Sequence, residues 1–269
     1  MKRVYIEDNW PESWKDSYQY DLQEIYGEIK NRGYAYAYDN RRHFALSMLT
    51  EVLEPGARVL DIAAAQGNFS LAMAELGYDV TWNDLREELA DYVIKKHENG
   101  AISFSPGNAF DLKFSTLFDG VLITEVIEHV AHPDDFLANT AKLVRPGGYI
   151  IMTTPNGEYF RNRLPKFSEC EDPTIFESIQ FRPNADGHIF LLYRDEVESF
   201  AADVGLRIDR FALFNNPLTS GHVKLNVLLN ALPKSVVAAC EGVTQRLPVP
   251  LASKISAQMA VRFQKPATN

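Results

Sequence analysis

A single stretch, residues 56–84, constrains the fold more than any other part of the chain. It begins with an apolar run that predicts a strand, and a turn of very small side chains at 63–67 follows. Residues 69–76 have helical periodicity, which ends at Gly77 as at a helix C-cap, and a second apolar run then predicts another strand. This strand–helix–strand order within one short stretch predicts an α/β fold with a parallel sheet.

Each of these two strands leads to a carboxylate, Asp61 after the first apolar run and Asp84 after the second. In an open parallel sheet, ligands bind beyond the carboxyl ends of the strands, where small turn residues let the backbone approach closely. The following helix also directs its amide groups at the ligand. Asp84 lies roughly 20 residues after the turn, where a carboxylate can accept hydrogen bonds from both ribose hydroxyls. Because many α/β proteins have such a turn, it is a weak signal alone.

The remaining elements follow from periodicity and from the positions of Gly and Pro. Residues 1–50 form a tyrosine-rich N-terminal cap, and 51–269 form a ligand-binding α/β domain with insertions at about 156–186 and 215–255, which are expected to be lids or binding loops. Further strands are predicted at 101–104, 118–124, 149–153, 206–214 and 258–264, and helices at 41–53, 87–96, 134–144 and 194–204.

Seven of the twelve tyrosines precede residue 40, and Trp10 and Trp14 lie among them. Tyrosine combines an apolar ring with a polar tip, so these side chains suit the wall or lid of a pocket for an aromatic or sugar-like ligand. The alternative is a helix that packs on the core through its rings.

The net charge of −9 argues against a broad nucleic-acid or anionic-membrane footprint, although a local basic surface is compatible with it. The two cysteines, Cys170 and Cys240, lack metal-ligand spacing and fit a reducing compartment. The sequence has no apolar signal core and no apolar run long enough to span a membrane. We therefore expect a cytoplasmic protein without a membrane span, and we do not expect nucleic acid as a partner.

Six segments, taken in order and spacing, resemble class I S-adenosylmethionine-dependent methyltransferases, although each segment is a weak signal alone. They are VLDIAAAQGNFS, VTWND, GNAFDL, FDGVLITEVIEHV, LVRPGGYIIMTTPN and HIFLLYRDEVESFAADVGL, and they cover about residues 56–214. The resemblance implies S-adenosyl-L-methionine as the cofactor. It also implies a Rossmann-like seven-stranded sheet with helices on both faces and an antiparallel last strand.

The resemblance assigns cofactor contacts to individual positions. Asp61 and the turn at 63–67 correspond to the loop around the methionine and sulfonium groups, and Asp84 corresponds to the ribose carboxylate. Asn108 and Ala109 correspond to the pair at the adenine edge, although aspartate is commoner at the first position. Two alanines replace glycines of the usual Gly-x-Gly-x-Gly loop, and their methyl groups could crowd the cofactor. The implied cofactor residues are Asp61, Ala63, Ala65, Gly67, Phe69, Asp84, Leu85, Asn108, Ala109 and Thr124.

Glu125, Glu128 and His129 follow the fourth predicted strand and are the candidate catalytic residues. In a helical turn they would share one face, where His129 could act as a base or all three could bind a divalent metal such as Mg²⁺, Mn²⁺ or Zn²⁺. Their pattern resembles ubiquinone-biosynthesis O-methyltransferases and also metal-dependent small-RNA 2′-O-methyltransferases. In the second resemblance, His188 corresponds to the histidine that completes the metal site. Purely structural roles are a third option.

We expect O-methylation of a small-molecule acceptor, such as a sugar, a phenol or another secondary metabolite, because the cap and the insertions suit an enclosed acceptor. A divalent-metal-dependent RNA 2′-O-methyltransferase and a non-catalytic cofactor-binding scaffold are the alternatives. The oligomeric state stays open, and a homodimer is one option. Three basic residues of the first insertion would contact a phosphate or carboxylate of the acceptor, or only solvent: Arg161, Arg163 and Lys166. An apolar helix predicted at 223–232 would pack on the core, or bind a lipid-like acceptor or a second subunit.

Overall fold

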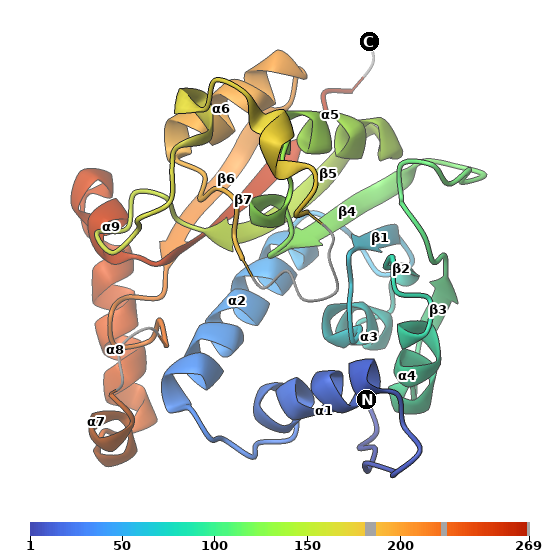
Figure 1. Ribbon diagram of the computed structural model, residues 1–269, viewed down its shortest axis with the longest axis horizontal. Helices are drawn as coiled ribbons and strands as arrows, with labels where there is room; N and C mark the ends of the chain where they lie inside the picture. The colour runs from blue at the N-terminus through green and yellow to red at the C-terminus, as the bar shows by residue number, and fades with distance from the viewer. Residues whose placement is uncertain (181–186, 222–224, 268–269) are drawn as a thin grey trace.

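The computed structural model describes residues 1–180, 187–221 and 225–267. Its centre is a seven-stranded sheet in the order β3-β2-β1-β4-β5-β7-β6 (Figure 1). Strand β7 runs antiparallel to β5 and β6, and the other neighbouring strands are parallel, which confirms the predicted sheet. The strands are β1 (Arg58–Ile62), β2 (Asp79–Asn83), β3 (Ala101–Phe104), β4 (Phe118–Thr124), β5 (Val144–Pro155), β6 (Arg207–Phe214) and β7 (Gln258–Gln264).

Most of the predicted helices are present, with ends shifted by a few residues. The main exception is the helix predicted at 41–53, which begins earlier, at Arg32. Asn31 explains this start, because its side chain accepts a hydrogen bond from Tyr34 N as an N-cap. The helices are α1 (Glu12–Glu24), α2 (Arg32–Thr50), α3 (Asn68–Glu75), α4 (Leu89–Lys96), α5 (Pro133–Leu143), α6 (Arg194–Asp203), α7 (Asn226–Ala231), α8 (Lys234–Gln245) and α9 (Val249–Ile255).

Alternate side chains of the central strands face two separate helical layers. Val59 and Leu122 pack in a cluster with residues of α2 and α3. Their neighbours Leu60 and Val121 point the other way and pack with residues of α5 and α6. Figure 1 shows α2 and α3 on one side of the sheet and α5 and α6 on the other. Burial on both faces explains why these strands read as continuous apolar runs.

Aromatic rings hold the N-terminal cap on the domain. The Trp10 ring lies 5.8 Å from that of Tyr18 and 5.6 Å from that of Tyr92 on α4, in edge-to-face arrangements. Packing through rings, the structural alternative for the aromatic residues of the cap, therefore accounts for Trp10 and Tyr18.

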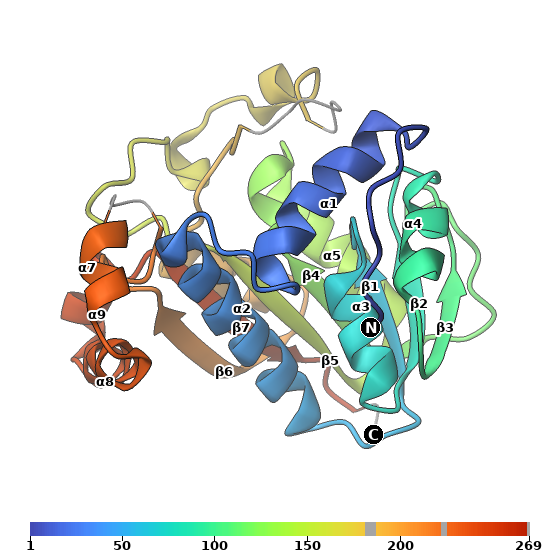
Figure 2. The same cartoon turned by 90° about the horizontal axis from the view of Figure 1, so that it is seen from below.

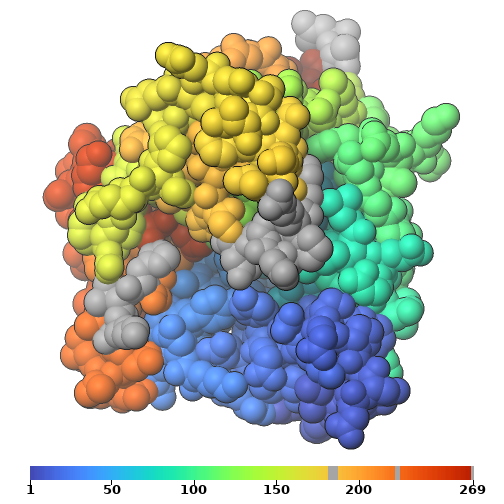
Figure 3. All heavy atoms as spheres, viewed as in Figure 1, coloured from blue at the N-terminus to red at the C-terminus, as the bar shows by residue number. Residues whose placement is uncertain are grey.

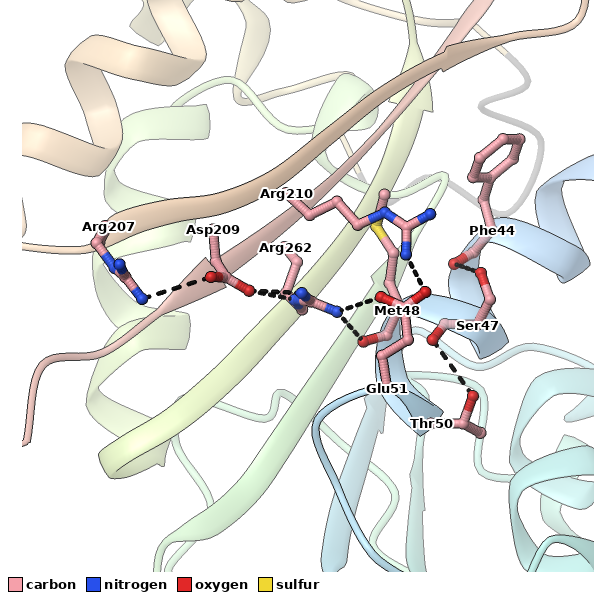
Figure 4. Close-up of polar contacts among 9 residues, drawn as sticks. All are labelled: Phe44, Ser47, Met48, Thr50, Glu51, Arg207, Asp209, Arg210 and Arg262. Atoms are coloured by element: carbon pink, nitrogen blue, oxygen red, sulfur yellow. Dashed lines mark hydrogen bonds and ion pairs between the residues drawn. The ribbon is translucent and has the colours of Figure 1, made fainter. Parts of the chain in front are cut away.

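The end of α2 is fixed to the antiparallel part of the sheet by charged side chains (Figure 4). Glu51, just beyond α2, forms ion pairs with Arg210 of β6 and Arg262 of β7. Arg262 also pairs with Asp209 at 2.6 Å and donates a hydrogen bond to Met48 O at 2.9 Å. Because several charges share this network, it constrains the position of α2 more firmly than an isolated surface pair would.

The two predicted insertions contain short helical elements. The first contains 3₁₀ turns at Phe167–Glu169 and Pro173–Phe176, and its residues 181–186 lie outside the described part of the chain. The second contains α7, α8 and α9. The apolar helix predicted at 223–232 is observed only as α7, and residues 223 and 224 of that prediction are not described. None of the helices in the described ranges is long and apolar enough to cross a membrane.

Candidate active site

The turn after β1 has the backbone of a glycine loop although alanines occupy it. Ala63 and Ala65 have φ angles of 57° and 46°, and Gly67 has a φ of 70°. A left-handed conformation costs a residue with a side chain roughly 1–2 kcal/mol, so other contacts must hold this turn. Gly67 cannot be replaced in the same way, because an added Cβ would lie 2.7 Å from Val93 Cγ2. The two alanines therefore adopt the left-handed backbone conformation that glycine adopts most easily.

The end of β2 supplies the contacts that hold this turn. Asp84 Oδ2 accepts a hydrogen bond from Ala65 N at 2.8 Å, and the Trp82 indole donates to Ala65 O at 3.0 Å. Ala64 N also donates to Asn83 O at 2.9 Å. Both polar groups of the Ala65 peptide segment are thus paired with β2, which stabilises the left-handed residue.

Asp61 is a buried carboxylate beneath this turn. Ser70 Oγ donates a 2.5 Å hydrogen bond to Asp61 Oδ2. Within the described residues, Asp61 Oδ1 has no hydrogen-bond partner. Burial raises the pKa of Asp61 to about 7, with the nearby charge of Asp84 acting in the same direction and the Ser70 hydrogen bond opposing the shift. An unpaired buried oxygen at this place suits a cationic group of a ligand.

Asp84 is also almost fully buried, but it already has partners. Besides Ala65 N, its carboxylate accepts hydrogen bonds from Arg86 N at 2.9 Å and Arg86 Nε at 3.0 Å. The Arg86 side chain is about half exposed, so a ribose that binds Asp84 would compete with this guanidinium rather than with a buried group. Next to it, Leu85 is an exposed apolar side chain.

The predicted adenine-edge residues lie in the loop after β3. Asn108 is exposed, and its amide is bonded to Asp111 Oδ2 and Phe110 N of its own loop. Ala109 is buried among apolar residues. The sequence interpretation did not include Asn83, which donates to Ser105 O at 2.6 Å and Gly107 O at 2.9 Å and so fixes this loop. The polar residue at the end of β2 was the available signal for it.

Two further predicted cofactor residues lie near the same strand ends. Phe69, in the first turn of α3, faces Tyr38 of α2, with 6.0 Å between ring centroids. Thr124 ends β4 and is partly buried. The prediction that these residues contact the cofactor stays a prediction.

The expectation of one helical face for Glu125, Glu128 and His129 is wrong. Only Ile127–His129 forms a 3₁₀ turn, and Glu125 has a left-handed φ of 52°. The Glu125 carboxylate instead accepts hydrogen bonds from Thr153 Oγ1 at 3.0 Å and Gln258 Nε2 at 2.6 Å. Glu125 therefore does not share a helical face with the other two residues, and its carboxylate connects the end of β4 to β5 and β7.

Glu128 and His129 do meet His188. Donor atoms of these three side chains lie within 4.8 Å of one another, and the rings of His129 and His188 are 4.9 Å apart. Glu125, the fourth predicted metal ligand, is not in this group. His129 Nδ1 lies 3.3 Å from Gly187 O, and because a carbonyl oxygen only accepts, His129 is the donor in this contact.

Glu128 is fully buried beside this pair of histidines. Its Oε2 accepts a hydrogen bond from Thr154 Oγ1 at 3.0 Å, and its Oε1 lies 4.0 Å from His129 Nε2. Burial raises the pKa of Glu128 well above its ordinary value, and the negative charge of Glu125 adds to the effect.

Arg41 of α2 is a candidate binding residue that the sequence interpretation missed. Its guanidinium lies 3.0 Å from Glu125 Oε2, and its Nε has no hydrogen-bond partner among the residues with described positions. Although burial disfavours its charge, Glu125 and Glu24 raise the pKa of Arg41. A largely buried cation with an unused donor suits an anionic ligand group. The available signal was an arginine among the tyrosines of a helix leading into the first strand.

The cap also contacts the turn after β1 directly. Glu24 of α1 accepts hydrogen bonds from Gln66 Nε2 at 3.1 Å and Asn68 Nδ2 at 2.9 Å. Together with Arg41, these contacts place α1 and α2 beside both the turn and the end of β4.

Comparison with models of protein families identifies the family of this chain. A family model described as a methyltransferase domain matches residues 31–210, which is most of the chain. The chain is a member of this family. It is a class I S-adenosylmethionine-dependent methyltransferase, and S-adenosylmethionine is the methyl donor that the family implies.

Curated relatives of this methyltransferase include ubiquinone biosynthesis O-methyltransferases. The mitochondrial protein of Schizosaccharomyces pombe is 35% identical over 120 residues, which cover 40% of this chain and 43% of the relative. The protein of Caulobacter sp. (strain K31) is 41% identical over 105 residues, which cover 38% of this chain and 42% of the relative. The chain thus matches less than half the length of these two relatives.

Solved structures share the fold at low identity. N-methyltransferase NodS of Bradyrhizobium japonicum, in complex with S-adenosyl-L-homocysteine, has a TM-score of 0.55 and 12% identity, covering 94% of this chain and 99% of its own. Phosphoethanolamine N-methyltransferase 2 of Haemonchus contortus has a TM-score of 0.54 and 18% identity. The match covers 84% of this chain and 52% of that protein. The [4+2]-cyclase SpnF has a TM-score of 0.54 and 15% identity, and the match covers 85% of this chain and 81% of SpnF. Similarity at this level shows the fold and leaves the acceptor open.

Proposed function

We propose that this methyltransferase methylates a hydroxyl oxygen of a small organic acceptor, with His129 as the base. The observation that carries the proposal is the placement of His129 in the 3₁₀ turn after β4, with its Nδ1 3.3 Å from Gly187 O. A neutral ring that donates to this carbonyl through Nδ1 has its basic nitrogen at Nε2. A hydroxyl must lose its proton as it is methylated, and a positioned imidazole can take it. The partial similarity to O-methyltransferases supports the same acceptor atom.

The buried groups of this chain fit S-adenosylmethionine, which supplies an electrophilic methyl carbon on its sulfonium. The unpaired Asp61 oxygen would face the ammonium group, and Arg41 would hold the carboxylate. Asp84 would accept hydrogen bonds from the ribose hydroxyls in place of Arg86. Methyl transfer is an in-line displacement, so the main task of these residues is to hold the donor and the acceptor oxygen on one line.

The acceptor side of the site favours an aromatic or sugar-like molecule such as a phenol. The buried hydroxyls of Tyr36 and Tyr38 on α2 have no hydrogen-bond partner within the described ranges. The Tyr38 ring lies 6.0 Å from that of Phe69 in a tilted arrangement, and the Arg41 guanidinium lies 5.6 Å from the centre of the Tyr38 ring. Rings with unused polar tips can contact both the faces and the hydroxyl groups of such an acceptor.

A second candidate keeps the same reaction but adds a divalent metal. The supporting observation is the set of Glu128, His129 and His188, whose donor atoms lie within 4.8 Å of one another. A carboxylate and two imidazoles can bind Mn²⁺ or Zn²⁺, and a metal there would help the acceptor hydroxyl lose its proton. An RNA acceptor is less well supported, since the chain carries a net charge of −9.

The proposal is tested by incubating the full chain with S-adenosylmethionine and a panel of phenols, catechols and sugars. We expect release of S-adenosylhomocysteine with at least one hydroxylated compound, and mass spectrometry should find one added methyl group on oxygen. Turnover only with amines, or only with RNA, would contradict the proposed acceptor class without affecting the fold assignment.

Substitution of Asp84 tests the ribose assignment. Asp84→Ala should raise the donor KM by roughly tenfold or more with a smaller change in kcat, because it removes charge-assisted hydrogen bonds worth about 1.5–3 kcal/mol. Arg86→Ala is the matched control: it removes the competing guanidinium and should leave the KM unchanged or lower it. Steady-state kinetics measures both, and an unchanged KM in Asp84→Ala would remove this residue from the donor site.

The raised pKa of Asp61 predicts pH-dependent donor binding. Below a pKa of about 7 the carboxyl becomes neutral and loses its attraction for the ligand ammonium group. We expect S-adenosylhomocysteine to bind up to about tenfold more weakly at pH 6 than at pH 8, as measured by calorimetry. Asp61→Asn should bind weakly at both pH values. A wild-type Kd that does not change over this range would show that Asp61 does not face the ligand.

A further inference from the structure

Helix α8 has a second apolar face that the domain does not cover. Its inner face is anchored by Val237, which is buried, and by the buried Glu241, whose carboxylate accepts hydrogen bonds from Asn215 N at 2.7 Å and Thr219 Oγ1 at 2.5 Å. A shallow hollow of about 520 Å³ runs along the outer face. The apolar residues that line it recur at helical spacing and are exposed: Val236, Ala239, Cys240 and Val243.

This apolar surface continues beyond α8. Leu251 of α9 is 52% exposed and Val227 of α7 is 86% exposed. Phe160 of the first insertion is 54% exposed and lies beside α9, because its backbone N donates to Lys254 O at 3.0 Å. Figure 3 shows this flank as the orange, red and yellow-green left side of the molecule, and Figure 2 shows α7, α8 and α9 together. Several large apolar side chains are therefore exposed on one side of the domain.

The charges on this flank are opposite in sign to those of the whole chain. Between residues 225 and 255, all of them described, the basic residues Lys234, Arg246 and Lys254 are exposed, and the one acidic residue, Glu241, is buried. The chain as a whole has a net charge of −9. An apolar surface bordered by positive charge on an acidic protein is suited to a negatively charged partner.

The charges and apolar side chains of this flank favour a membrane over a second copy of the chain as its binding partner. A two-fold dimer would place the flank on itself and bring its basic residues together without exposed acidic residues to pair with them. An anionic bilayer offers an apolar interior for the exposed Val, Leu and Phe side chains and phosphate groups for Lys and Arg. We propose that α7–α9 and Phe160 form a surface that docks on an anionic lipid bilayer.

The test is co-sedimentation of the full chain with lipid vesicles. We expect binding to phosphatidylcholine vesicles that contain about one third phosphatidylglycerol, little binding to phosphatidylcholine alone, and weaker binding at high salt. The double variant Val243→Glu, Arg246→Glu should bind the anionic vesicles roughly tenfold less or weaker still. Both side chains are exposed, so this variant should unfold at the wild-type temperature.

The matched control replaces one exposed β-branched residue and one exposed basic residue elsewhere by glutamate. Ile94 of α4 is 50% exposed and Lys142 of α5 is exposed, and both lie outside this flank. The double variant Ile94→Glu, Lys142→Glu should bind anionic vesicles like the wild type. Equal loss in both variants, or no binding of the wild type to anionic vesicles, would overturn the proposal. A dimer in analytical ultracentrifugation that the first variant abolishes would instead assign the flank to a second copy.

Discussion

Replacing His129 by alanine is expected to slow methyl transfer by roughly 10²-fold or more, because the variant lacks the base that takes the acceptor proton. The effect should appear in kcat, since the proposal assigns His129 to the acceptor hydroxyl and not to the donor bound at the turn after β1. The donor Kd, measured with S-adenosylhomocysteine, should stay near the wild-type value. The measurement is the single-turnover rate with an acceptor identified from the panel of phenols, catechols and sugars.

His132 is the matched control for this variant. It is partly exposed, it precedes α5, and its Nε2 lies 2.9 Å from Glu177 Oε1 rather than near Glu128. His132→Ala should therefore leave the rate within about twofold of the wild type, as expected for a surface change. A His129→Ala enzyme that is as active as His132→Ala would remove His129 from the mechanism.

Chelator treatment and a His188→Ala variant distinguish a metal-free base from the metal-bound alternative. If Glu128, His129 and His188 hold an ion, a chelator should abolish activity and Mg²⁺, Mn²⁺ or Zn²⁺ should restore it. His188→Ala should then be as inactive as His129→Ala. If His129 acts as a base alone, the chelator should have no effect. His188→Ala should then keep most of the activity, because His188 is exposed and 4.9 Å away between ring centres.

The sheet was predictable because its signals are local. Apolar runs gave the positions of the strands, and Gly77, with a φ of 92°, ends the region of α3 as predicted. The start of β5 at Val144 was placed too late, at residue 149. The first residues of β5 include Pro146 and two glycines, which normally interrupt a strand. The pairing of β4 with this part of β5 is irregular and has a register shift.

The candidate site was less predictable because contacts between distant residues decide it. The left-handed φ of Glu125 follows from partners on β5 and β7, and no local pattern signals them. Arg41 is more than eighty residues from Glu125 in sequence, and only the packing of α2 brings the pair to 3.0 Å. By contrast, the proximity of Asp61 and Asp84 was predictable because the ends of parallel strands meet at one edge of the sheet.

Replacing the buried Lys96 by methionine should destabilise the protein by about 3–5 kcal/mol, because it leaves the carboxylate of Asp21 buried without its cationic partner. Both side chains are fully buried, and Lys96 Nζ lies 2.8 Å from Asp21 Oδ2 and 2.7 Å from Asn68 Oδ1. Burial lowers the pKa of Lys96, and the Asp21 carboxylate opposes this shift. Tyr92 also donates to Asp21 at 2.6 Å. Urea unfolding at pH 7 measures the change in free energy.

The neighbouring Lys95 provides the matched control. Its side chain is 43% exposed and its Nζ lies 3.6 Å from Glu7, so Lys95→Met should change the free energy of unfolding by less than about 1 kcal/mol. The double variant Asp21→Asn, Lys96→Met should be more stable than Lys96→Met alone, because no unpaired charge stays buried. Similar losses in Lys95→Met and Lys96→Met would show that the buried pair does not hold α1.

This buried pair also connects stability to function. Asn68, which contacts both Asp21 and Lys96, is the first residue of α3 and directly follows Gly67 of the turn after β1. If the pair holds α1 in place, Lys96→Met should weaken S-adenosylhomocysteine binding even under conditions in which the domain stays folded, while Lys95→Met should not. The position of the N-terminal cap would then set the geometry of the donor site, although no residue of the pair contacts the reacting atoms.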